Sequence, residues 1–121
     1  MGQPVVHWEL WSKEPERTGR FYAEIFGWNV VAVPDLSYHM VDTQSAGGIN
    51  GGIMKPKEGP WPGNLALYID VDDLDAYRVR ITAAGGKTLV ERMEIPGFGA
   101  LALFEDTDAR VFGLWQRAVA P

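Results

Sequence analysis

Cysteine is absent from the 121-residue sequence. The chain therefore cannot form a disulfide, a thiolate nucleophile, a zinc–thiolate site or an iron–sulfur cluster. No run of apolar residues approaches the roughly 20 that a helix needs to span a bilayer. The first four residues also lack the basic and apolar segments of a signal peptide. We expect a cytoplasmic protein without a membrane partner.

Positive charge is also scarce. The sequence has 11 Lys and Arg against 16 Asp and Glu, a net charge of −5, and the basic residues are scattered along it. Because binding to a phosphate backbone needs clustered cations, nucleic acid is not an expected partner. The 46% of hydrophobic residues are enough to close the core of one domain without a disulfide or a structural metal.

The sequence repeats itself once. Val5–Trp28 aligns with Asn64–Lys87 at an offset of 59 residues without a gap. Each copy opens on an apolar, aromatic-rich run, Val5–Trp11 or Leu65–Val71, which predicts a strand. The two halves of the chain are therefore expected to share one arrangement of elements.

A helix is predicted after each of these strands. Glu14 and Asp73 stand at the expected N-caps, where a carboxylate can accept free amide hydrogens and oppose the helix dipole. Gly27 and the pair Gly85–Gly86 stand at the ends, where a left-handed residue is common.

Three short strands follow each predicted helix. The segments lie at 28–33, 38–43 and 49–55 in the first copy and at 88–93, 100–105 and 111–116 in the second. Residues 57–63 are rich in Pro and Gly, which predicts a connector between the two copies. We predict one α+β domain over residues 1–121, with module one at about 4–56 and module two at about 64–118.

Each module then has the order βαβββ, with a helix on one face of its sheet. Pairing the two uncovered faces would enclose a half-open barrel cavity. A ferredoxin-like or dimeric α+β-barrel domain is the competing architecture, but it has a different number of strands after each helix.

Three segments resemble the vicinal-oxygen-chelate superfamily, which contains glyoxalases, bleomycin resistance proteins and dioxygenases. Phe21–Trp28 is similar to its helix end, Val71–Ala76 to its strand-to-helix turn, and Phe104–Gln116 to its closing hairpin. The resemblance implies the paired βαβββ fold over almost the whole chain.

The resemblance also allows a test for a metal. Members that do chemistry hold one divalent ion with four ligands, one from the first and last strand of each module. The corresponding positions are occupied by His7, Gly52, Ala66 and Gly113. A single imidazole cannot form a high-affinity divalent site, so we predict no metal and no other cofactor.

His7 and Glu9 alternate on one face of the first strand and are both expected to point into the cavity. A carboxylate beside an imidazole can set its tautomer and pKa, which is typical of acid–base catalysis. Alternatively, His7 is a satisfied polar residue left from a metal-binding ancestor. The same alternation predicts an aromatic, sparsely polar ligand pocket formed by Trp11, Met54, Tyr68, Val111 and Trp115.

Two functions are compatible with these features. The first is metal-independent binding of a small aromatic or apolar organic ligand, as in members similar to bleomycin resistance proteins. The second is a glyoxalase-like lyase, isomerase or dioxygenase-type enzyme that uses His7 and Glu9 or an unconventional metal. The resemblance also makes a homodimer possible.

Overall fold

The computed structural model describes residues 2–34, 36–56 and 64–118. By their internal contacts the residues fall into two compact units. The N-terminal unit is His7–Ala66, and the C-terminal unit combines Met1–Val6 with Leu67–Pro121. The division lies close to the predicted module boundary, except that the first residues belong with the second half. The predicted connector at 57–63 lies outside the described residues.

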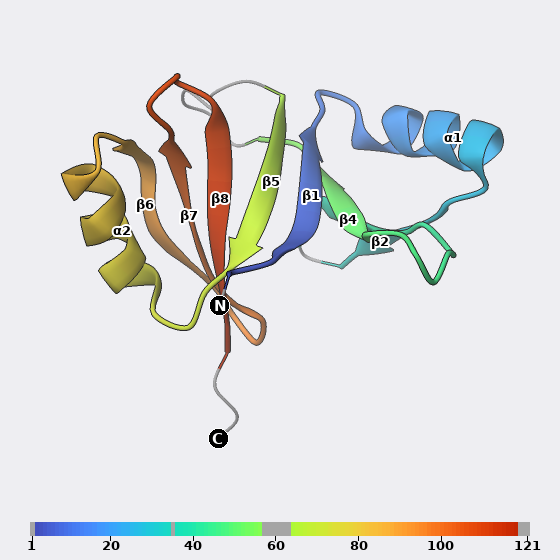
Figure 1. Cartoon of the computed structure of the whole chain (residues 1–121). Coiled ribbons are helices and arrows are strands. Elements are labelled where there is room, and N and C mark those ends of the chain that lie inside the picture. Colours follow the sequence, from blue (N-terminus) through green and yellow to red (C-terminus); the bar gives the residue numbers. More distant parts are fainter. Residues whose placement is uncertain (1, 35, 57–63, 119–121) are drawn as a thin grey trace. The chain divides into compact units, whose positions relative to one another are not determined.

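The N-terminal unit contains one helix and a four-stranded sheet (Figure 1). Its elements are β1 (Val5–Trp11), α1 (Pro15–Phe26), β2 (Asn29–Val33), β3 (Tyr38–Asp42) and β4 (Gly51–Met54). The strand order is β2-β3-β4-β1. The β1–β4 pair is parallel, while β2–β3 and β3–β4 are antiparallel.

The C-terminal unit repeats this arrangement. It contains β5 (Leu65–Asp70), α2 (Leu74–Ala83), β6 (Lys87–Ile95), β7 (Gly99–Glu105) and β8 (Val111–Arg117). The strand order is β5-β8-β7-β6, again with a parallel first pair and two antiparallel pairs. The predicted α+β class and the two βαβββ modules are confirmed. The cavity expected between the modules stays a prediction.

The two helices begin differently. The Asp73 side chain accepts a hydrogen bond from the Ala76 amide at 3.1 Å, as its N-cap position predicts. The Glu14 side chain makes no such bond, so the capping expected there is wrong. The α1 helix has Pro15 at its first position, where the missing amide hydrogen costs nothing. Gly27 ends this helix with the predicted left-handed backbone, at φ 71°.

Each helix covers one face of its own sheet. In the C-terminal unit, α2 covers a buried apolar cluster of Val71, Leu74, Ala100, Ala102 and Leu114. In the N-terminal unit, the ring of Trp28 stacks on Tyr22 of α1, with the ring centroids 5.1 Å apart. The same ring lies next to Trp8 of β1, at a centroid distance of 5.3 Å. An added Cβ at Gly19 would lie 3.0 Å from Val30, which shows how closely α1 approaches the sheet.

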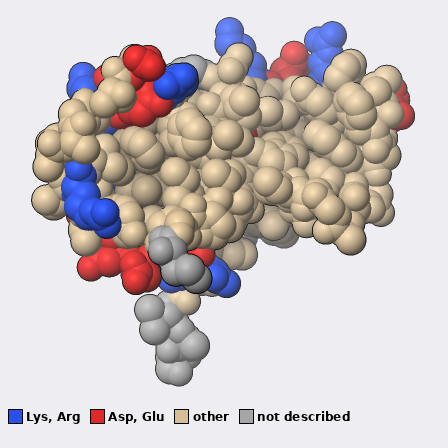
Figure 2. Space-filling view, viewed as in Figure 1, with Lys and Arg blue, Asp and Glu red and all other residues tan. Residues whose placement is uncertain are grey.

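Charged side chains of both signs lie side by side on the face shown in Figure 2. Among the described residues several charges are paired, and Arg92, for example, contacts Asp75 at 3.0 Å and Glu94 at 2.6 Å. Neither helix in the described part of the chain is long and apolar enough to cross a membrane.

Candidate functional site

The face of the N-terminal sheet that α1 does not cover carries the predicted site residues. Paired residues in neighbouring strands point to the same side of a sheet, and the side alternates along each strand. Glu9 pairs with Gly52, and Trp11 pairs with Met54. Since Tyr38 is also opposite Met54, this open face is formed by His7, Glu9, Trp11, Tyr38, Met40, Gly52 and Met54.

Hydrogen bonds connect polar side chains on this face. His7 Nε2 lies 2.6 Å from the Tyr38 hydroxyl. Tyr38 also lies close enough to Glu9 for the carboxylate to raise the pKa of its hydroxyl, and the Trp11 indole donates to Glu9 Oε1 at 2.7 Å. Only 4% of Glu9 is exposed. The two predicted catalytic residues therefore belong to one network, with Tyr38 between them.

Burial and charge shape the acid–base properties of this network. Burial lowers the pKa of His7, so its imidazole is neutral at pH 7. The pKa of Tyr38 is raised by burial first, then by the negative charge of Glu9 and the hydrogen bond to it. Both shifts keep a proton on the phenol and a lone pair on the imidazole.

Tyr38 was not identified from the sequence as a site residue, although it lies at the centre of the network. Only the backbone pairing of β3 with β4 places it opposite Met54 and beside Gly52. The neighbouring His39 lies on the opposite, α1-covered side and is half-buried, with a buried Nδ1.

Gly52 leaves room for the tyrosine. A Cβ added at Gly52 would overlap the hydroxyl, Cζ and Cε2 of Tyr38. The glycine thus accommodates the neighbouring tyrosine side chain. A carboxylate at this position, where the superfamily resemblance expects a metal ligand, would compete with Tyr38 for the same space.

Gly113 has the corresponding role in the C-terminal unit. It pairs with Tyr68, and a Cβ added to it would overlap the Tyr68 ring. In each unit, therefore, a tyrosine lies where the last-strand metal ligand would extend.

The residues at the four family ligand positions do not fit a divalent ion. His7 Nε2 is engaged by Tyr38, Gly52 and Gly113 supply no donor, and Ala66 is a buried methyl side chain with 1% exposure. Divalent metals in proteins need several converging oxygen or nitrogen donors. No step of a mechanism is assigned to a metal at these positions.

The other predicted ligand residues lie in the C-terminal unit, on the sheet face that α2 does not cover. Tyr68 is buried at 2% exposure, while Val111 and Trp115 are half-buried on β8. Leu101 and Leu103 pair with Trp115 and Gly113 and share their side. This face is apolar, as the alternation predicts.

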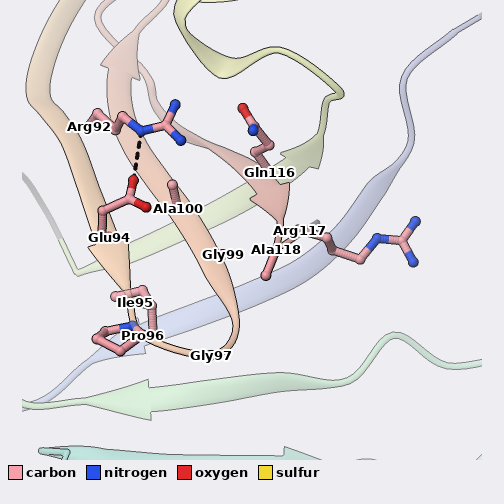
Figure 3. Close-up of a pocket in the computed structure, with 10 residues that line it drawn as sticks. All are labelled: Arg92, Glu94, Ile95, Pro96, Gly97, Gly99, Ala100, Gln116, Arg117 and Ala118. Carbon is pink, nitrogen blue, oxygen red and sulfur yellow. Dashed lines mark hydrogen bonds and ion pairs between the residues drawn. The ribbon is translucent and has the colours of Figure 1, made fainter. Parts of the chain in front are cut away.

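Two surface hollows lie elsewhere and contain none of the predicted site residues. One, of about 300 Å³, lies beside the β6–β7 turn and the end of β8 (Figure 3). Arg92 points along one side of it toward Glu94. The other, of about 550 Å³, lies at the start of α1.

The duplicated βαβββ order now has a counterpart among known proteins. The family model of the Glyoxalase/Bleomycin resistance protein/Dioxygenase superfamily matches residues 5–112. The chain belongs to this superfamily. The match covers both units, so the fold predicted from the three sequence segments is the fold of this superfamily.

Similar proteins of this superfamily differ in length. "Anthracycline biosynthesis protein DnrV" of Streptomyces peucetius is 29% identical over 92% of this chain, but the match covers 46% of that protein. A "Glyoxylase-like domain-containing protein" of Didymella fabae is 29% identical, with 90% of each covered. The chain spans about half the length of the first of these relatives.

Among solved structures, a glyoxalase/bleomycin resistance protein/dioxygenase superfamily member from Vibrio splendidus 12B01 has a TM-score of 0.63. The two are 17% identical, and the comparison covers 95% of this chain and 99% of the other. At this identity the likeness shows the fold alone.

Proposed function

We propose that the chain binds a small, flat, largely apolar organic molecule without a metal, and that His7 is the polar contact. The observation that carries the proposal is the composition of the open face of the N-terminal unit. The His7–Tyr38 pair lies on the same face as Met40, which is 49% exposed, and Val31, which pairs with Met40 and is 53% exposed. Small-molecule sites typically combine apolar contact area with a few placed polar groups.

The apolar residues supply the area for such a ligand. Met54 is half-buried on β4 beside Tyr38, and a thioether adapts well to an aromatic ring. Trp11 is 8% exposed and holds Glu9, so its part in the site is to support the network. Tyr68, Val111 and Trp115 form a comparable apolar face in the C-terminal unit, and we propose that this face also binds an apolar organic molecule.

The name of one relative agrees with this ligand class. Anthracyclines, which the name of DnrV mentions, are flat polycyclic aromatic compounds. A ligand of that shape would cover Met40 and Val31 with its ring system and meet His7 at a polar edge.

The second candidate is a glyoxalase-like enzyme that works by acid–base chemistry. The hydrogen bond between His7 and Tyr38, with Glu9 close to Tyr38, favours it, because a neutral imidazole is a competent base. Since Glu9 is buried, it would act on His7 through Tyr38 and would not touch a substrate. In this case His7→Ala abolishes turnover, and retained activity removes His7 from the mechanism.

Thermal unfolding with a hydroxyanthraquinone such as alizarin tests the binding proposal. We expect the unfolding temperature to rise, because a ligand that binds only the folded state stabilises it, and we expect the rise to persist in EDTA. Met40→Asp should remove the rise, whereas Val79→Asp, on an exposed position of α2, should retain it.

Two outcomes contradict the proposal. One is a panel of aromatic ligands that leaves the unfolding temperature of the native chain unchanged. The other is a tightly held, stoichiometric divalent ion in the purified protein, which would contradict the predicted absence of a metal.

A further inference from the structure

The strand β2 lies at the edge of the N-terminal sheet. Among the strands that the structure describes, only β3 pairs with it. Its other side therefore presents a row of backbone amides and carbonyls to which another strand can pair. We propose that this edge is a self-association site, at which β2 pairs antiparallel with β2 of a second copy of the chain. The inference concerns a different property from ligand binding and does not depend on it.

The edge strand of the C-terminal unit is protected against such pairing. The strand β6 has four charged side chains among its nine residues, Lys87, Glu91, Arg92 and Glu94. Its pairing with β7 is also shifted at two points. Charged side chains and irregular pairing are two ways in which proteins prevent the edges of sheets from joining. We therefore do not expect β6 to pair with a second copy.

The strand β2 has neither form of protection. Its five residues, Asn-Val-Val-Ala-Val at 29–33, contain no charge and no proline, and they pair with β3 without a shift. Three valines also favour an extended backbone. Val31 is 53% exposed, so apolar surface lies directly beside the edge. An edge strand with these properties is prone to pair with another strand.

A second copy of the chain is a partner that this edge fits. Each copy has a net charge of −5, so two copies repel one another unless the surface between them is uncharged. The strand β2 meets this condition. A twofold axis through the middle of the strand would place the strand against itself. One contact would then cover the unprotected edge of both copies.

The register follows from this symmetry. Placing Val31 opposite Val31 of the second copy pairs all five residues, with position 29 opposite 33 and position 30 opposite 32. Paired side chains point to the same side of a sheet, and Val31 lies on the open face with Met40, its partner in β3. Since Met40 is 49% exposed, the two copies would form one apolar row across the axis.

The small size of the contact determines its expected strength. A stable interface typically contains about 20–30 residues on each side, whereas β2 supplies five and a few neighbours. We therefore expect a weak dimer that forms as the protein concentration rises and dissociates on dilution. Sedimentation velocity of the native chain over a range of concentrations measures this equilibrium. A chain that stays monomeric throughout, which would leave the edge to an extended segment of another protein, would overturn the inference.

Opposite charges at position 31 test whether the edge is the contact. In Val31→Lys and in Val31→Glu, like charges face each other across the axis, and we expect the dissociation constant to rise at least about tenfold in each. Because Val31 is exposed, both variants should fold. An equimolar mixture should restore the dimer, since Lys then faces Glu. The absence of this recovery overturns the inference, as does a dimer that persists in both variants and is lost in Ile25→Glu on α1.

A disulfide tests the register. The native chain has no cysteine, so a single introduced thiol can bridge only two copies. Directly opposite residues have Cα atoms about 5 Å apart, within the range of a disulfide, whereas diagonal neighbours are about 7–8 Å apart. With oxidised glutathione as the oxidant, we expect Val31→Cys to form a covalent dimer readily. Ala32→Cys, the matched control one residue along, should form much less, and equal yields would overturn the proposed pairing.

Discussion

At the scale of single residues, two glycines fit closely against two tyrosines. A Cβ added at Gly52 overlaps Tyr38, and one added at Gly113 overlaps Tyr68. The glycines and the aromatic rings are therefore complementary. Aromatic side chains therefore occupy the space at two positions where the superfamily resemblance implies a metal ligand.

Gly52→Ala tests this complementarity. We expect a loss of about 1–3 kcal/mol in the free energy of unfolding, measured by urea denaturation, because overpacking displaces Tyr38. Gly47→Ala is the matched control, since a Cβ at Gly47 meets nothing within 4 Å. In the Tyr38→Ala background, Gly52→Ala should lower the free energy of unfolding by less than it does in the native chain. Equal stability of the two single glycine variants would contradict the tight fit.

At the scale of elements, the two helix starts look alike in sequence and differ in structure. Both have an acidic residue before the first turn, but only Asp73 accepts an amide hydrogen. At the start of α1, the Ser12 hydroxyl accepts from the Glu14 amide at 3.1 Å, and Glu14 contacts Arg17 at 3.6 Å on the surface. A position next to a helix therefore does not by itself establish a cap.

The two acidic residues are expected to contribute differently to the free energy of unfolding. Asp73→Ala should lower the free energy of unfolding by about 1 kcal/mol, which is typical for the loss of an N-cap. Glu14→Ala should change it by less than about 0.5 kcal/mol, because an exposed ion pair contributes little. Denaturant titration of both variants measures the difference, and Asp73→Asn should retain most of the stability. Equal losses in the two alanine variants would contradict the assignment.

The strands show what sequence patterns can and cannot provide. Alternation correctly placed His7, Glu9 and Trp11 on one side of β1, because the side-chain period of a strand is fixed at two. It did not indicate which residue of another strand would lie beside them. Tyr38 reaches His7 from 31 residues away in sequence through the pairing of β3 with β4.

At the scale of the whole molecule, His7 makes stability depend on pH. Its pKa is lowered by burial in the folded state, so the unfolded chain binds its proton more readily. The stabilisation by the neutral, buried imidazole is present above the ordinary value of 6.5 and is lost as the pH falls toward the folded pKa.

Urea titrations between pH 7.5 and 5 measure this effect. We expect the free energy of unfolding to decrease with falling pH in the native chain, and to decrease less in His7→Gln. Asp106, whose pKa is lowered by the backbone amides of Arg110 and Asp108, contributes only in a lower window, below its ordinary value of 3.8. A profile that is identical in His7→Gln would exclude His7 as the source.

The possible homodimer is also a prediction for the whole molecule. Phe21, Ile25 and Phe26 on α1 are 56%, 61% and 59% exposed, and apolar side chains of this size are common in interfaces between subunits. If a dimer uses this surface, Ile25→Glu should convert it to a monomer in analytical ultracentrifugation, while Val79→Glu on α2 should not. A native chain that sediments as a monomer would contradict the prediction.

The sequence by itself determined the repeat, the βαβββ order and the sides of the strands, because these depend on local periodicity and on turn residues. It also predicted that the four positions at which the superfamily resemblance implies metal ligands, His7, Gly52, Ala66 and Gly113, do not supply four donors. Only the tertiary structure decided what fills the space at two of them. The hydrogen bond between His7 and Tyr38 depends on strand register, which brings together residues that no local pattern connects.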